Sequence, residues 1–508
     1  MTQVSISNAT RRRYAAGAVL LGLLLYGLTT APGVLWQDSG MFQFRVWHGD
    51  ELGDLGLPLA HPLYVMLARA FTWLPLGDFA FKVNLFSALC SAVALGFLID
   101  LLLSLTGSRA AAVAGTVLMA VSHTFWTHAV IAEVYSLYSL GLMVELWLIQ
   151  RFFSRRQARW LVAALLINGL NLSNHLMALL HLPAYGGVVL WGLRVRCLRA
   201  KQLLLLAAAV VVGSAAYLSL IAGQIAGGEP VLATLKQALV GPPSRAKVVL
   251  QTSFPIGRQV LKTAQYFALN FPTPLALLAP VGLWAAWKQP RTRWFAAFGG
   301  VVFVIAFLFA LRYLVPDQFV FFTPCYALFA VFVAIGAAWF VGLSNRRRLA
   351  CVLLALAPVA VYEATPPLMK RFHIAGPFQR HIPLRDSYTY FLRPRKNGET
   401  SAARFARAAL RRAAPDGLLI ADTTIMNALA YVRDIEGVER NVTLHFGCDV
   451  TPAPPAVDLN ADEVRPFAVR GRAFACTGAP RYLRPWIPKA YDLIPDGHLF
   501  RLVPKAAD

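Results

Sequence analysis

Carboxylates are the side chains of this sequence with the clearest capacity for acid–base chemistry. Ten Asp or Glu precede residue 363, and eight of them are predicted to lie at one face of a set of apolar helices: Asp38, Asp50, Glu51, Asp54, Asp78, Glu133, Glu229 and Asp317. A carboxylate that is partly removed from water at a helix end gains the basicity that a general base needs. Asp38, in the string Trp36-Gln37-Asp38-Ser39-Gly40, is predicted to be such a base. Alternatively, Asp38 or Ser39 caps the next helix by accepting its first amide protons, and spacing alone favours this capping role.

Further polar residues occur near the ends of the apolar runs. His61 precedes Pro62, where it either stabilises an anionic leaving group or caps a turn. Glu133 and Tyr135 open an apolar run, and a carboxylate at a membrane rim is a functional candidate by default. A Glu at a helix start is equally favoured by the helix dipole, so both interpretations stay open.

Two later segments add candidates of the same kind. Asn168, Asn171, Ser173, Asn174 and His175 form a polar cluster inside an apolar run, where such groups either bind a ligand or bond across helices. Arg312, Tyr313 and Asp317 share a short predicted loop. Arg312 there either holds a phosphate or pairs with Asp317 without a catalytic role.

The elements that must position these residues are membrane helices. Hydrophobic residues make up 57% of the 508 positions and charged residues only 14%, and the mean hydropathy is +0.55. These values exclude a soluble, disordered or fibrous chain. Because a bilayer core requires runs of about 20 apolar residues, we predict eleven spans: 14–34, 79–104, 110–128, 133–150, 160–172, 176–193, 202–222, 263–287, 294–311, 322–343 and 349–362. The first loop, residues 33–78, is aromatic and predicts short helices in the membrane interface.

Loop charge predicts the orientation. With the N-terminus inside, the six inner segments carry 18 Lys or Arg and no acid in 47 residues, whereas the outer loops carry 8 in 112 residues. The positive-inside rule then places the N-terminus in the cytoplasm and the tail outside. The net charge of +23 is therefore mainly a topology signal, and nucleic acid is not an expected partner.

The composition changes at residue 363, so we divide the chain into a membrane domain, 1–362, and a soluble outer domain, 363–508. A helix over 401–414, a strand over 417–421, a helix over 426–435 and a strand over 442–446 predict a small α/β unit. Cys448 and Cys476 are its only cysteines, and on the oxidising side of a membrane they are candidates for a disulfide.

Familiar nucleotide and metal motifs are absent. The sequence has no G-x-G-x-x-G after a strand, no P-loop, no H-E-x-x-H, no C-x-x-C and no G-x-S-x-G. We therefore predict no cofactor and no metal ligands, although a single Asp in the motif neither demands nor excludes a divalent ion.

Several strings together resemble a membrane-protein family, long labelled unknown, that is related to protein O-mannosyltransferases. The similar strings are Trp36-Gln37-Asp38-Ser39-Gly40, His61-Pro62, Phe125-Trp126, Ala132 to Leu137, Asn174-His175 followed by Pro183, Tyr313 with Asp317, Phe321 and Pro324, and, in the tail, Asp422, Tyr431 and 436–442. The resemblance covers most of the chain and is strongest over the first 180 residues. It implies a GT-C fold, which is a polytopic α-helical membrane bundle whose site at the outer face uses a lipid-phosphate sugar.

This resemblance suggests a mechanism. A polyprenyl-phosphate-linked sugar donor would lie in the bilayer with its phosphate at the outer face, and an acceptor hydroxyl of a protein or glycan would attack it with inversion. We assign Asp38 as the base, Arg312 and His61 to the phosphate, and Glu133 and His175 to the pocket, with Tyr135, Asn174, Tyr313 and Asp317 as further donor- or acceptor-binding candidates. Met41 departs from the family, which commonly has an acid there, and His61-Pro62 lacks the second proline and the glycine.

Other functional classes stay open from the sequence. A flippase or transporter of a lipid-linked sugar also needs many helices and buried polar residues, but it is expected to show internal symmetry, and we find none. A structural or sensory protein with the tail as binding module is the third alternative. The expected location is a bacterial inner membrane, with the outer domain in the periplasm.

Overall fold

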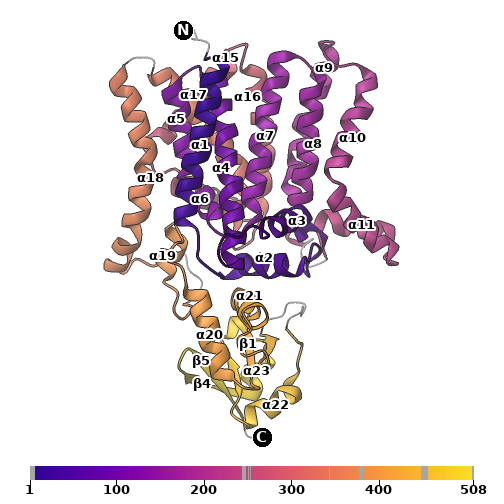
Figure 1. Ribbon diagram of the computed structural model, residues 1–508, viewed down its shortest axis with the longest axis vertical. Coiled ribbons are helices and arrows are strands. Elements are labelled where there is room, and N and C mark those ends of the chain that lie inside the picture. Colours follow the sequence, from indigo (N-terminus) through magenta and orange to yellow (C-terminus); the bar gives the residue numbers. More distant parts are fainter. Residues whose placement is uncertain are drawn as a thin grey trace.

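The computed structural model describes residues 6–242, 247–249, 251, 253–341, 344–376, 381–447 and 456–505. A helical bundle forms one end of the molecule and a smaller α/β domain the other (Figure 1). The bundle elements, in chain order, are α1 (Asn8–Thr29), α4 (Phe79–Thr106), α5 (Arg109–Ala120), α6 (His123–Ala129), α7 (Val134–Arg155), α8 (Ala158–Asn174), η2 (Leu176–His181), α9 (Leu182–Arg194), η3 (Ala200–Gln202), α10 (Leu203–Gly213), α11 (Ala215–Ala226), α12 (Val231–Val240), α14 (Ile256–Asn270), η4 (Pro274–Leu278), α15 (Ala279–Lys288), α16 (Arg293–Arg312), η5 (Gln318–Phe322), α17 (Thr323–Val341) and α18 (Asn345–Arg371).

Each predicted apolar span coincides with helical structure, but not every one is a continuous helix. In the described residues, 5 helices are long and apolar enough to cross a membrane, or up to 8 if each bent pair is one span, so the number eleven stays a prediction. The predicted spans 110–128, 202–222 and 263–287 each correspond to a pair of helices that meet at a bend of 65°, 71° and 115°, respectively. At the second break Ser214 Oγ donates to the Val210 carbonyl at 2.8 Å, and such back-bonding bends helices.

Close helix contacts in the bundle depend on small residues. A Cβ atom at Gly282 of α15 would lie 1.8 Å from the Phe332 carbonyl oxygen of α17. Likewise, a Cβ atom at Gly336 of α17 would lie 2.2 Å from the Leu278 carbonyl oxygen. Glycine at both positions therefore lets the two backbones touch, which is the typical way in which membrane helices gain packing energy without a hydrophobic driving force.

Three short helices lie across the end of the bundle that faces the α/β domain: α2 (Gln37–His48), η1 (Leu57–Leu59) and α3 (Pro62–Phe71) (Figure 1). They confirm the prediction of short helices in the first loop. Buried Arg45 organises this loop, because its guanidinium donates to the carbonyls of Asp50, Glu51, Leu59 and Ala60 at 2.5–3.2 Å. Burial lowers the pKa of Arg45, and Asp50 opposes that effect.

The C-terminal part confirms the predicted α/β unit. A 5-stranded sheet has the order β2-β1-β3-β5-β4, with β1 parallel to β2 and β3, and β5 antiparallel to β3 and β4. Its strands are β1 (Leu418–Ala421), β2 (Thr443–Phe446), β3 (Ala473–Ala475), β4 (Tyr491–Asp496) and β5 (Leu499–Pro504). Its helices are α19 (Ser387–Leu392), α20 (Ser401–Ala413), α21 (Thr423–Ala430), η6 (Tyr431–Ile435), α22 (Ala461–Val469), η7 (Pro480–Tyr482) and α23 (Trp486–Ala490).

The sheet has a separate core on each face, and one of these cores reaches the bundle. Val34, Trp36 and Ala80 of the membrane part are buried in one cluster with Phe405 and Met426. The Trp36 indole also donates to Ser401 Oγ at 2.8 Å, and the Ala80 N–H donates to the Tyr431 hydroxyl at 3.0 Å. The α/β domain is therefore packed against the rim of the bundle.

Asp422, at the turn from β1 to α21, caps the helix by accepting the Thr424 N–H at 2.9 Å. Cys448 lies outside the described residues, so its disulfide with the buried Cys476 stays a prediction. The last bundle helix continues to Arg371, past the predicted domain boundary at 362.

Lys396 is a buried lysine at the junction of the two parts. Lys396 is 4% exposed, and its ammonium group donates to the carbonyls of Tyr390 and Arg393, both at 2.6 Å. The backbone N–H of Lys396 donates to the carbonyl of Thr29, at the end of α1, at 2.8 Å. Burial lowers the pKa of Lys396 from 10.5 to about 7.

We predict that this lysine makes the protein more stable as the pH rises from 7 to 9. Over that window the unfolded chain binds a proton that the folded chain does not, so unfolding takes up a proton and the free energy of unfolding rises with pH, by at most about 3 kcal/mol. Thermal unfolding of wild type and Lys396→Met at several pH values measures it. The variant has no ammonium and should lose this part of the pH dependence; parallel pH curves for the two proteins would refute the prediction.

Candidate functional site

Asp38 lies in the first turn of α2, at the end of the bundle next to the α/β domain. The residue that caps this helix is Trp36, which makes no side-chain cap bond, so the capping alternative for Asp38 or Ser39 is wrong. The carboxylate instead lies near the positive end of the helix dipole, which stabilises its charge. It is exposed, and the expectation of partial burial is therefore also wrong. Exposure leaves the carboxylate within reach of an acceptor.

The residues around Asp38 fix its place. Gln43 Oε1 accepts the Leu35 N–H at 3.1 Å, and Gln43 Nε2 donates to the Gly33 carbonyl and to Asn84 Oδ1. A Cβ at Gly40 would lie 2.5 Å from the Leu35 carbonyl oxygen. The glycine of the motif therefore permits the close approach of this carbonyl to α2. Gln43 and Asn84 were not predicted from the sequence, because their partners are backbone groups of a loop that only folding brings together.

Glu133 supplies a second carboxylate at this rim. It precedes α7 as its cap residue, makes no side-chain cap bond and is 9% exposed. Its carboxyl group lies within electrostatic range of those of Asp38 and Asp317. Acids from three separate segments, the starts of α2, α7 and η5, therefore meet here. Close carboxylates disfavour one another's ionised forms, so a proton that reaches the cluster is stabilised.

His61 and His175 lie side by side, with ring centroids 5.1 Å apart. His61 has a left-handed backbone (φ 52°) before Pro62. Its Nδ1 is 2.6 Å from the Asn174 carbonyl, and because a carbonyl only accepts, Nδ1 carries the proton. His175 Nδ1 instead accepts the Met177 N–H at 3.1 Å, so a neutral His175 carries its proton on Nε2.

This tautomer difference changes the expected roles. A neutral His61 presents an acceptor at Nε2, and it serves an anionic phosphate only as an imidazolium. A neutral His175 is already a donor at Nε2. Asn174, which joins the two histidines, is held by donation from its Nδ2 to the Val134 carbonyl at 3.1 Å.

Aromatic rings connect the histidines to the later segments. Tyr135 stacks on His128 at 4.9 Å and lies 5.2 Å from His175. Phe321 lies 6.1 Å from both Tyr135 and His175, and Tyr313 packs edge-on against Phe321 at 4.6 Å. The Tyr135 hydroxyl is also within electrostatic range of Asp38, Glu133, Tyr313 and Asp317. The structure therefore brings together eight of the predicted residues: Asp38, His61, Glu133, Tyr135, Asn174, His175, Tyr313 and Asp317.

Arg312 is the member that the described contacts do not connect to this cluster. It ends α16, is exposed, and donates to the Gln251 carbonyl at 2.7 Å. It is adjacent in sequence to Tyr313 and thus lies at the same rim. Within the described ranges, no group of three or more His, Cys, Asp or Glu side chains has an arrangement that would hold a metal ion.

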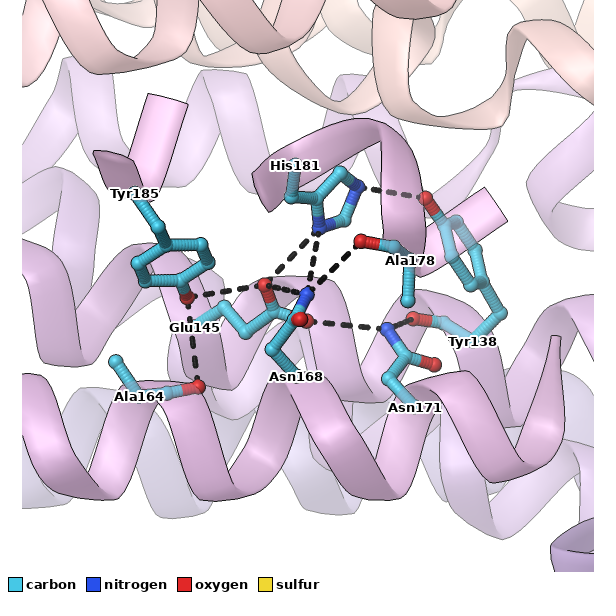
Figure 2. Close-up of polar contacts among 8 residues, drawn as sticks. All are labelled: Tyr138, Glu145, Ala164, Asn168, Asn171, Ala178, His181 and Tyr185. Atoms are coloured by element: carbon cyan, nitrogen blue, oxygen red, sulfur yellow. Dashed lines mark hydrogen bonds and ion pairs between the residues drawn. The ribbon is translucent and has the colours of Figure 1, made fainter. Parts of the chain in front are cut away.

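Below the rim, a buried polar network joins α7, α8 and α9 (Figure 2). The Glu145 carboxylate accepts hydrogen bonds from Asn168, Asn171, His181 and Tyr185 at 3.0–3.2 Å. Tyr138 bonds to His181 at 2.9 Å, and its ring lies 5.9 Å from His175. For Asn168 and Asn171 this confirms the interpretation as bonds across helices. The central role of Glu145 was missed, because its four partners follow it by 23 to 40 residues.

Comparisons with known proteins show what this chain is similar to. Residues 56–197 match the family model of the protein O-mannosyl-transferase TMEM260 N-terminal domain. The mouse protein O-mannosyl-transferase TMEM260 is 32% identical over 125 residues, which are 24% of this chain and 17% of the mouse protein. The TMEM260-like segment contains His61, Glu133, Tyr135, Asn174 and His175.

The whole chain also matches solved structures. ArnT from Cupriavidus metallidurans bound to undecaprenyl phosphate has a TM-score of 0.58 and 14% identity, and the match covers 97% of this chain and 98% of ArnT. ArnT in the apo state has a TM-score of 0.55 and 15% identity, with 98% of each chain covered. The chain thus has the GT-C fold of a multi-pass membrane protein, as the resemblance of its motifs implied.

Proposed function

We propose that this protein is a membrane glycosyltransferase that moves a sugar from a polyprenyl-phosphate donor to an acceptor hydroxyl at the outer face of the membrane. The observation that carries the proposal is that Glu133 lies within electrostatic range of Asp38 and Asp317 at one rim of a GT-C bundle, where Tyr135 packs beside His175. The full-length likeness to an ArnT structure that holds undecaprenyl phosphate supports the donor class. The TMEM260 match supports a mannose-like sugar and a protein Ser or Thr acceptor.

In this mechanism Asp38 is the general base. Its carboxylate takes the proton of the acceptor hydroxyl while that oxygen bonds to the anomeric carbon from the face opposite the phosphate. The bond between the anomeric carbon and the phosphate oxygen breaks with inversion, and polyprenyl phosphate leaves as an anion. His175 Nε2–H is suited to donate to the leaving phosphate, whereas His61 and Arg312 contribute positive charge. Preorganised donors at a developing anion are usually the largest catalytic contribution.

The orientation supports the same assignment. The 18 basic residues of the predicted inner segments favour a cytoplasmic N-terminus. The rim with Asp38 and the α/β domain would then face the outside, which is the periplasm of a bacterial inner membrane. There the α/β domain, packed on α2, would present the acceptor to the rim.

A donor-cleavage assay tests the proposal. Purified protein is incubated with a radiolabelled polyprenyl-phosphate hexose and Ser/Thr-containing peptides, and both released polyprenyl phosphate and labelled peptide are measured. We expect the two products in equal amounts. Movement of intact donor across proteoliposomes without cleavage would contradict a transferase and indicate a flippase. Release of polyprenyl phosphate with label on a glycan or lipid would contradict only the protein acceptor.

A further inference from the structure

A cavity with a strongly basic lining lies at the end of the bundle opposite the candidate site. It is formed by α1, α4 and α7 near the N-terminus (Figure 1) and has a volume of about 510 Å³. Its charged residues are four arginines, Arg11, Arg12, Arg151 and Arg155, and one acid, Asp100. A neighbouring cavity of about 110 Å³ shares Arg11, Arg151 and Arg155 and adds Arg291.

Asp100 and the tryptophans hold part of this lining in place. Arg11 forms two hydrogen bonds to the Asp100 carboxylate, both 2.7 Å, and the Trp147 indole donates to it at 2.6 Å. Arg151 reaches Asp100 at 3.5 Å and stacks on the Trp147 ring at 4.0 Å. A basic loop that served topology alone would need no such fixed guanidinium groups.

The remaining arginines carry charge that Asp100 does not balance. Among the ion pairs of the described residues, none includes Arg12 or Arg155, and the lining has three more positive than negative groups. Guanidinium groups recognise phosphate by paired N–H donors. The cavity is thus suited to a phosphate group.

Part of the cavity lining is apolar. It consists of Ala15, Ala16 and Val19 of α1 and Val93 and Phe97 of α4. This apolar lining adds nothing to the binding of inorganic phosphate, whereas a phospholipid carries an acyl chain close to its phosphate. Basic pockets between membrane helices are typical binding sites for lipid headgroups. We propose that this cavity binds an anionic phospholipid, with the phosphate at the arginines and one acyl chain along α1 and α4.

Native mass spectrometry of the delipidated full-length protein tests this proposal. The protein is titrated in separate arms with phosphatidylglycerol, phosphatidylcholine and inorganic phosphate. We expect phosphatidylglycerol to bind at least about tenfold more tightly than phosphatidylcholine, since each basic residue near a membrane surface favours anionic lipid. Equal affinity for the two lipids would overturn the proposal. Displacement of the lipid by millimolar inorganic phosphate would show a simple phosphate site and overturn it as well.

Variants locate the binding. Arg12→Gln with Arg155→Gln leaves the Asp100 contacts intact and should weaken phosphatidylglycerol binding about tenfold or more. Arg346→Gln with Arg348→Gln removes the same charge from another predicted inner segment and should change it less than twofold. Ala16→Trp fills the apolar part of the cavity without a change of charge, so it should weaken the binding of lipid but not that of phosphate. Circular dichroism checks folding, and equal effects of the two double variants would refute the location. No step of this test depends on transferase activity.

Discussion

We expect the substitution Asp38→Asn to abolish sugar transfer and to leave the fold intact. The amide keeps the size and the polarity of the side chain but does not take the proton of an acceptor hydroxyl. A positioned general base contributes about 10²- to 10⁴-fold to a rate, so we expect a loss of kcat of at least about a hundredfold. Because Asp38 is exposed and caps no helix, the melting temperature should hardly change. Measurement of labelled product under single-turnover conditions, together with thermal unfolding, checks both parts.

The matched control is Asp78→Asn. Asp78 precedes α4, is exposed, and makes no side-chain cap bond. Its substitution therefore removes a carboxylate from the same predicted face without changing the cluster. Its turnover should stay within a factor of two of wild type. Normal turnover by Asp38→Asn would exclude Asp38 as the base. If Glu133→Gln abolished transfer and Asp38→Asn did not, the general base would be Glu133, the buried acid within electrostatic range of Asp38.

Glu145→Ala should strongly destabilise the membrane part. The substitution removes the acceptor that four buried donors share, and it leaves Asn168, Asn171 and Tyr185 only their weaker or equal bonds to backbone carbonyls. Removal of one partner from a buried charged network costs about 3–5 kcal/mol. We therefore expect a large fall in melting temperature, or loss of detergent-stable protein, measured by thermal unfolding followed with tryptophan fluorescence.

Two further variants separate the hydrogen bonds from packing. Tyr185→Phe removes one donor and leaves the carboxylate its other partners, so it should cost only about 1 kcal/mol. Glu145→Gln keeps one acceptor oxygen and should lie between the two. A melting temperature of Glu145→Ala equal to that of Tyr185→Phe would show that the network contributes little to stability.

The positions of the helices were predicted from the sequence and the breaks within them were not, because the two features depend on different interactions. Apolar runs report burial in a bilayer residue by residue, so the sequence located helices such as α4 and α16 to within a few residues. It did not locate the breaks within three of the runs, because a hydropathy average does not register individual hydrogen bonds such as that from Ser214 Oγ to the Val210 carbonyl at one of the breaks.

The sequence alone determined that the chain is a polytopic membrane protein of GT-C type with a C-terminal α/β domain. It also singled out the candidate site residues, because rare acids and histidines at the ends of apolar runs are costly in a membrane. Only the tertiary structure decided that Asp38 is exposed while Glu133 is buried, which histidine nitrogen carries the proton, and that the Trp36 indole bonds to Ser401. These features depend on contacts between groups up to 365 residues apart, and the geometry of such contacts exists only after the chain has folded.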